Sequence, residues 1–121
     1  MKPIGDNERR VANVHSAEYK AFVGDSGEEL GTGILKLNPD MPLAQGFYIY
    51  KMEPGSSSTP HRHGGAEEFY MIEGELIDND GTVYKQGDVV WLKEGTEHTS
   101  HTKTGCLVAV FAEGEETAPG S

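Results

Sequence analysis

The segment that most constrains the fold of this chain spans residues 54–74, PGSSSTPHRHGGAEEFYMIEG, and carries three side chains able to bind a metal ion. His61 and His63 are two positions apart, and Glu67 follows four positions later. Residues two apart on an extended strand point to the same side, about 6–7 Å from each other, so both imidazoles can converge on one ion. The glycines at 64 and 65 permit a tight turn or bulge that brings the carboxylate back toward them. This ligand set suits Fe, Mn, Zn, Ni or Cu.

Glu68 is the rival of Glu67 as the carboxylate ligand. The predicted core strand at 67–73 alternates, so an inward Glu67 places Phe69 and Met71 on the same buried face. An inward Glu68 would leave those two apolar side chains facing out. Strand parity therefore favours Glu67.

A second segment, residues 87–102, supplies a fourth candidate ligand, which is a third imidazole. Its sequence is GDVVWLKEGTEHTSHT, in which His98 follows an apolar strand and a glycine-containing turn. If His98 points inward, alternation takes Ser100 and Thr102 inward and His101 outward. His101 is therefore a poor ligand candidate despite its proximity.

These two segments resemble the two sequence motifs of the cupin superfamily. The first is similar to G-x5-H-x-H-x3/4-E-x6-G, with the positions filled by Gly55, His61, His63, Glu67 and Gly74. The second is similar to G-x5-P-x-G-x2-H-x3-N, with Gly87, Gly95 and His98 in place but Lys93 for proline and Thr102 for asparagine. Neither departure falls on a ligand. The resemblance implies an all-β, cupin-type double-stranded β-helix (an antiparallel jelly-roll barrel) whose metal ligands are His61, His63, Glu67 and His98.

The rest of the chain reads as short strands and turns. Strands are predicted from alternation and from β-branched or aromatic content at 17–23, 30–37, 46–52, 67–73, 82–85, 88–92, 98–102 and 105–111. Turns are predicted at 24–29, 38–42 and 78–81. No long amphipathic helix, internal repeat or phosphate-binding loop is evident, which favours an antiparallel barrel or a double-sheet jelly roll.

The strand at 46–52 supplies the only candidates for a catalytic role. Tyr48 and Tyr50 share one face, and Lys51 lies on the other. Because the lysine is the residue least suited to the interior, we expect the tyrosines to face the barrel interior near the metal. A packing role is favoured over proton donation or substrate contact.

Two single residues carry expectations of their own. Trp91, the only tryptophan, is expected in the core or at a subunit interface. Cys106 is the only cysteine, so the chain forms no internal disulfide, and we expect it to be a small buried hydrophobe on a core strand.

Length and charge limit the number of domains and the kinds of partner that the chain can have. The 121 residues suggest one domain, with an N-terminal arm at 1–16, a barrel at 17–112 and an acidic flexible tail at 113–121. Acidic residues outnumber basic ones 20 to 10, which argues against nucleic acid and anionic membranes as partners. The start of the chain lacks the apolar run of a signal peptide, and no window reaches the ~18–20 apolar residues of a membrane span. A cytoplasmic location is expected.

Among cupins, the chain most resembles the group related to ChrR-type anti-sigma factors and acetylacetone-cleaving dioxygenases, on the strings HRHGGAEE and GCLVAVF. The resemblance implies a metal-dependent dioxygenase, with Fe(II) favoured over Zn, Mn or Ni, acting on a small chelating substrate such as a β-diketone or hydroxyketone. The alternatives are a non-redox lyase or isomerase, or a zinc-binding small-ligand sensor or interaction module. Anti-sigma activity is disfavoured because no room for a helical domain is expected before Ala17, and a storage role ranks last. A homodimer is expected from the resemblance.

Overall fold

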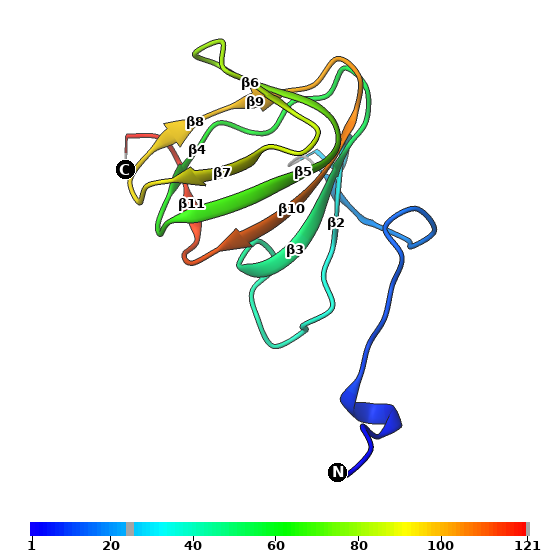
Figure 1. Ribbon diagram of the computed structural model, residues 1–121. Coiled ribbons are helices and arrows are strands. Elements are labelled where there is room, and N and C mark those ends of the chain that lie inside the picture. The colour runs from blue at the N-terminus through cyan, green and yellow to red at the C-terminus, as the bar shows by residue number, and fades with distance from the viewer. Residues whose placement is uncertain (24–25, 121) are drawn as a thin grey trace.

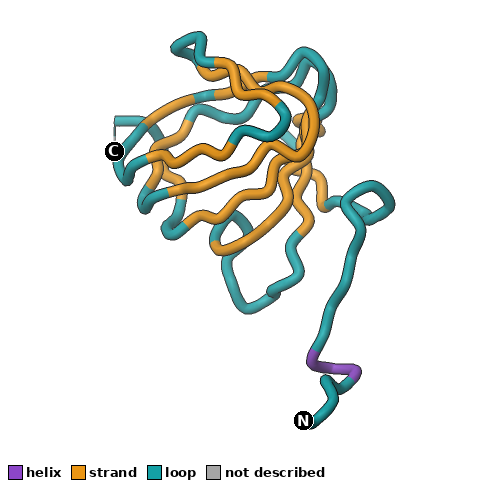
Figure 2. The backbone as a smooth tube through the Cα atoms, viewed as in Figure 1, coloured by secondary structure: helices purple, strands orange, loops and turns teal. Residues whose placement is uncertain are grey.

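A computed structural model describes residues 1–23 and 26–120, and their regular secondary structure is almost entirely β-strand (Figures 1 and 2). One short 3-10 turn, η1 (Asp6–Glu8), precedes the strands. The strands are β1 (Lys20–Val23), β2 (Glu29–Leu35), β3 (Gly46–Met52), β4 (His61–His63), β5 (Glu67–Asp78), β6 (Val83–Lys85), β7 (Val89–Leu92), β8 (Glu97–His98), β9 (Ser100–His101), β10 (Cys106–Ala112) and β11 (Glu116–Thr117). The prediction of an all-β fold is confirmed.

The long strand β5 organises the antiparallel sheets. Its first half pairs with β10 on one side and β7 on the other, and its second half pairs with β6 and β9. The large sheet continues from β10 through β3 and β2 to β1. A small sheet in the order β11-β4-β8 completes the curled half-barrel of the jelly roll. This topology brings residues 61–63, 97–98 and 116–117 together, although they are far apart in the sequence.

Alternation along β5 has the predicted phase. Phe69 and Met71 are buried and Tyr70 is exposed, so the inward choice of Glu67 over Glu68 is confirmed. Met71 has no exposed surface, and burying such a side chain contributes roughly 1.5–3 kcal/mol to folding. The core around it contains Ile34, Tyr48, Met52, Phe69, Met71, Leu76, Cys106, Val108, Val110 and Ala112.

The prediction that Cys106 is buried is confirmed, whereas the prediction that Trp91 lies in the core is not. Cys106 is buried on β10 as predicted, and burial raises the pKa of its thiol to about 11, so it stays protonated at neutral pH. Trp91 is 61% exposed, so the suggestion of a core position is wrong. Because β7 alternates, Val90 and Leu92 turn toward the core while Trp91 lies on the outer face of the sheet.

Three further expectations need adjustment or fall partly outside the described residues. The predicted strand at 98–102 is two short strands, β8 and β9, which pair with different partners. The predicted turn at 24–29 includes residues 24 and 25, and the predicted tail includes residue 121, which lie outside the described residues. Across the described part of the chain, no helix has the length and apolar character needed to cross a membrane.

Candidate metal centre

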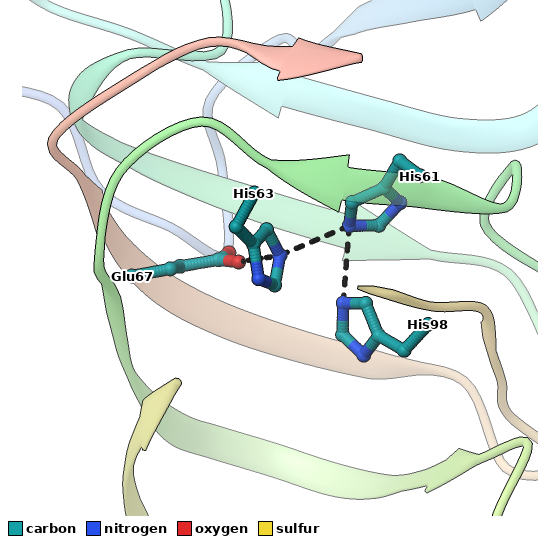
Figure 3. A group of neighbouring side chains, drawn as sticks. All are labelled: His61, His63, Glu67 and His98. Atoms are coloured by element: carbon teal, nitrogen blue, oxygen red, sulfur yellow. Dashed lines mark hydrogen bonds and ion pairs between the residues drawn. The ribbon is translucent and has the colours of Figure 1, made fainter. Parts of the chain in front are cut away.

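Four side chains from three strands meet inside one end of the half-barrel (Figure 3). His61 and His63 come from β4, His98 from β8 and Glu67 from the start of β5, and the β4–β8 pairing sets His61 opposite His98. The Nε2 atom of His61 lies 3.1 Å from Nε2 of His63 and 3.0 Å from Nε2 of His98. Nε2 of His63 lies 2.5 Å from Oε2 of Glu67. All four predicted ligands are therefore brought together.

Contacts on the far side of two imidazoles fix which nitrogen carries the proton. Nδ1 of His61 donates to the carbonyl oxygen of Thr59 at 2.7 Å, and Nδ1 of His98 donates to the carboxylate of Asp78 at 3.0 Å. A carbonyl or carboxylate oxygen can only accept, so Nδ1 must hold the proton in both rings. In the neutral rings, Nε2 is left as an unprotonated lone pair.

The third imidazole is held in the same way through a hydroxyl group. The Thr96 hydroxyl donates its proton to the carbonyl oxygen of Lys93 at 2.8 Å. Its oxygen therefore accepts from Nδ1 of His63, which lies 2.9 Å away. Neutral His63 also presents a bare Nε2 to the cluster.

With the three rings neutral and Glu67 ionised, the cluster holds four electron-pair donors that face one another. Oε2 of Glu67 is buried and receives no hydrogen bond from the described residues. Lone pairs held 3.0–3.1 Å apart repel one another unless a cation lies between them. Two donors on one metal ion at bond lengths of about 2.1 Å lie about 3.0 Å apart when they are at right angles. The residues present thus fit a divalent transition metal.

Asp78 supports the cluster from behind His98, a role that the sequence analysis missed. It ends β5, is buried, and accepts hydrogen bonds from His98, the Ser100 hydroxyl at 2.5 Å and the Tyr84 hydroxyl at 2.6 Å. Burial would raise the pKa of Asp78, but these three hydrogen bonds lower it below its usual value. Burial would likewise lower the pKa of His98, but the Asp78 carboxylate raises it.

Replacing Asp78 with asparagine is expected to weaken metal binding by about 10–100-fold, the usual effect of changing a residue that orients a metal-bound imidazole. The amide keeps an acceptor oxygen but removes the charge that holds Nδ1–H of His98. Competition with a chromogenic chelator would measure the affinity. Asp80→Asn is the matched control, because Asp80 is exposed and caps the neighbouring turn. Unchanged affinity in Asp78→Asn would contradict the supporting role.

A cavity of about 510 Å³ opens beside the cluster and is walled mainly by apolar side chains. Tyr48 and Tyr50 both line it, as the sequence predicted, while His61, Glu67 and His98 form its polar end. Burial, together with the nearby Glu67 and Glu116 charges, raises the pKa of Tyr48 well above its usual range. Burial raises the pKa of Tyr50 to about 12. Both hydroxyls therefore remain protonated donors at neutral pH, and their catalytic role stays a prediction.

Glu116 is a second carboxylate at this cavity, and it lies in the segment expected to be a flexible acidic tail. Within that segment, Glu116–Thr117 form β11, which pairs with β4 so that Glu116 lies opposite His63. Oε1 of Glu116 is 3.5 Å from Nε2 of His61. Partial burial and the charge of Glu67 raise the pKa of Glu116, while His61 lowers it, with a net rise.

The glycine pair after His63 explains how this segment approaches so closely. The Gly64 amide donates to the Glu115 carbonyl at 2.8 Å, and a Cβ on Gly65 would lie 2.7 Å from the Gly114 nitrogen. Neither Gly64 nor Gly65 has a positive φ. These glycines are thus needed for the passage of the C-terminal segment, and not for the left-handed turn conformation that glycine usually serves.

The family model described as the ChrR cupin-like domain matches residues 7–114. The chain belongs to this family. No curated protein matches the chain.

Solved structures show the same fold at low sequence identity. An acetylacetone dioxygenase from Acinetobacter johnsonii is 16% identical, with a TM-score of 0.68 over 98% of this chain and 84% of that one. The polyketide cyclase RemF from Streptomyces resistomycificus is 20% identical, with a TM-score of 0.65 over 89% and 81%. The anti-sigma factor ChrR of Rhodobacter sphaeroides, solved with SigE, is 16% identical, with a TM-score of 0.65 over 84% and 52%. The chain therefore spans about half of that ChrR structure.

Proposed function

We propose that the protein is a metal-dependent enzyme, of dioxygenase type, that acts on a small substrate with two chelating oxygens. One observation carries the proposal: the ligand atoms of three imidazoles and one carboxylate converge beside an open, mainly apolar cavity, which His61, Glu67 and His98 line. Structural zinc sites are usually closed, tetrahedral and rich in thiolate, and this cluster contains no cysteine. A three-His, one-Glu set leaves coordination positions open on a five- or six-coordinate ion.

The cavity favours a compact, weakly polar substrate. Its volume lies within the range of about 300–1,000 Å³ that small-molecule sites usually have. The side chains of Phe69, Val108 and Val110 give it apolar walls. A β-diketone or hydroxyketone can turn two oxygens toward the polar end and leave its carbon skeleton against these walls.

Each part of the site has a separate task in this proposal. His61, His63, His98 and Glu67 would hold the ion, with Fe(II) favoured over Zn, Mn or Ni. When bound, such an ion supplies Lewis acidity and, if it is iron, electrons for dioxygen chemistry. Tyr48 and Tyr50 remain protonated, so they can donate hydrogen bonds to the substrate's oxygens. The apolar walls limit the water that competes for those positions.

Oxygen uptake tests this function. Protein reconstituted anaerobically with Fe(II) is expected to consume oxygen when 2,4-pentanedione or a small hydroxyketone is added. His98→Ala, treated identically, is expected to consume none above background. Iron-loaded wild-type protein that consumes no oxygen with any of these compounds would contradict the dioxygenase assignment while leaving the metal site intact.

A non-redox enzyme or a zinc-binding sensor is the second candidate, and the family match favours keeping it. The matched model is named after ChrR, and one structural neighbour is an anti-sigma factor in complex with its sigma factor. Another neighbour is a polyketide cyclase. Substrate loss without oxygen uptake would favour a lyase or isomerase. Tightly held zinc, with ligand binding but no turnover, would favour the sensor.

A further inference from the structure

Glu116 stands on the cavity side of the four-residue cluster and is held there by its own strand. β11 pairs with β4 through Glu116–His63 and Thr117–Arg62, and the amide of Gly120 donates to the Glu97 carboxylate at 2.5 Å. The hydrogen bond from Gly64 to Glu115 fixes the preceding residue. The side chain is 36% exposed and lines the cavity, so its carboxylate faces the space that a substrate would enter.

The distance from Glu116 to the cluster matches that between two donors that share an ion. Two donors with metal bonds of about 2.1 Å lie about 3.0 Å apart at a right angle and about 3.4 Å apart at the tetrahedral angle. The imidazole nitrogens of the cluster are 3.0 and 3.1 Å apart, and Oε1 of Glu116 is 3.5 Å from Nε2 of His61. Glu116 thus lies within coordination reach of an ion held by His61.

We propose that Glu116 is a fifth protein ligand, which occupies a position on the metal until a chelating substrate displaces it. The proposal rests on the proposed function of the site. Two carboxylates and three neutral imidazoles balance the charge of a divalent ion. After displacement, the Glu116 carboxylate remains beside the substrate and repels anions. The site should therefore select neutral chelating substrates over carboxylates such as 2-oxo acids.

The variant Glu116→Gln tests this role, with Glu115→Gln as the matched control on the same segment. Glu115 contacts Gly64 through its main-chain carbonyl, and its side chain is exposed. Co(II) serves as the probe, because its visible absorption depends on coordination number and ligand type. Glu116→Gln is expected to bind Co(II) about 10-fold more weakly and to change its visible spectrum, while Glu115→Gln matches the wild type. Binding of 2-oxoglutarate should strengthen in Glu116→Gln, and binding of 2,4-pentanedione should change less.

The outcomes separate this inference from the proposed function. If wild-type protein binds Co(II) and Glu116→Gln has the same affinity and spectrum, the ligand role of Glu116 is overturned and the four-residue site stands. If wild-type protein binds no metal, both proposals fail. Circular dichroism of the metal-free variants checks that each is folded before the affinities are compared.

A second, independent observation concerns the outer face of the large sheet. Strand register aligns Phe47 on β3 with Phe111 on β10, then Glu68 on β5 and Trp91 on β7. Phe47 is 61% exposed, Phe111 47% and Trp91 61%. The next row adds exposed Tyr70 and Val89. This row, Phe47–Phe111–Glu68–Trp91, which we call the apolar row, crosses four strands and places three exposed aromatic side chains on one face, with the Glu68 carboxylate among them.

We infer that a second copy of this chain covers the apolar row. Residues 1–16 carry three basic and two acidic side chains, so they have a net charge of +1 and leave −11 on the remainder. Residues 1–13 are exposed, and Figure 1 shows this arm running away from its own barrel. Each copy thus offers both a matching apolar row and a basic arm that complements the acidic barrel of the other. The net charge of −10 disfavours nucleic acid or an anionic membrane as the occupant.

Light scattering coupled to gel filtration tests the dimer. The wild-type chain is expected to elute at twice its chain mass at tens of micromolar. Trp91→Glu is expected to be monomeric with unchanged metal content, and Val83→Glu, exposed on β6 outside the row, is expected to remain dimeric. A monomeric wild-type protein, or a Trp91→Glu variant that is still dimeric, would overturn the inference.

Discussion

Replacing His98 with alanine is expected to abolish stoichiometric metal binding and the thermal stabilisation that the metal provides. The change removes one of the four donors and leaves the Asp78 carboxylate without its imidazole partner. A ligand present at 100 times its Kd stabilises a protein by about 2.7 kcal/mol, which for a domain of this size corresponds to roughly 10 °C in Tm. Differential scanning fluorimetry with and without EDTA would measure the difference.

His101→Ala is the matched control for this experiment. His101 lies three residues after His98 but is exposed, because strand alternation turns it outward. The His101→Ala variant should keep its full metal content, and its Tm should fall when EDTA removes the metal, as in the wild type. An equal response to EDTA in His98→Ala and wild-type protein would show that His98 is not a ligand.

The paired variants Glu67→Gln and Glu68→Gln are expected to give the second large effect. Glu67 is buried with Oε2 2.5 Å from Nε2 of His63, whereas Glu68 is exposed on the outer face between Phe111 and Trp91. Losing the Glu67 charge should lower metal affinity by roughly 100-fold or more, beyond the range of changes in supporting residues. Glu68→Gln should change it less than twofold. Isothermal titration with Zn(II) or Co(II) would compare them, and the reverse ranking would identify Glu68 as the ligand.

His61, His63 and Glu67 could be placed together from the sequence because their geometry is largely local. The H-x-H spacing fixes the relative direction of His61 and His63 on one strand. The apolar side chains Phe69 and Met71 reveal which face of β5 is buried and so which carboxylate points inward. The resemblance of the second segment to a known motif supplied His98.

The remaining parts of the site depend on pairings between distant segments, which the sequence pattern does not reveal. Asp78 reaches His98 because β5 and β9 run side by side. The sequence pattern predicted only that Asp78 begins a turn. Glu116 reaches His61 because β11 pairs with β4, although its surroundings read as a loose acidic tail. Gly64 and Gly65 allow the C-terminal segment to pass close to the chain. In the sequence, this glycine pair indicates only a tight turn or a bulge.

Trp91 illustrates a different difficulty. The strand VVWL on β7 is apolar at every position, so alternation alone does not distinguish its inner face from its outer face. The structure resolves this, because Val90 and Leu92 pack against the core and Trp91 faces out. Trp91 is therefore an exposed side chain on the outer face of the sheet, where it belongs to the apolar row.

Elemental analysis of the protein, after reconstitution and removal of loosely bound ions, tests most directly whether three imidazoles and Glu67 form one site for a divalent transition metal. We expect one metal ion per chain in the wild type and less than one tenth of that in His98→Ala. Iron retained in active form would agree with the proposed oxygen chemistry. A wild-type protein that retains no metal under these conditions would show that these four side chains do not form a metal site.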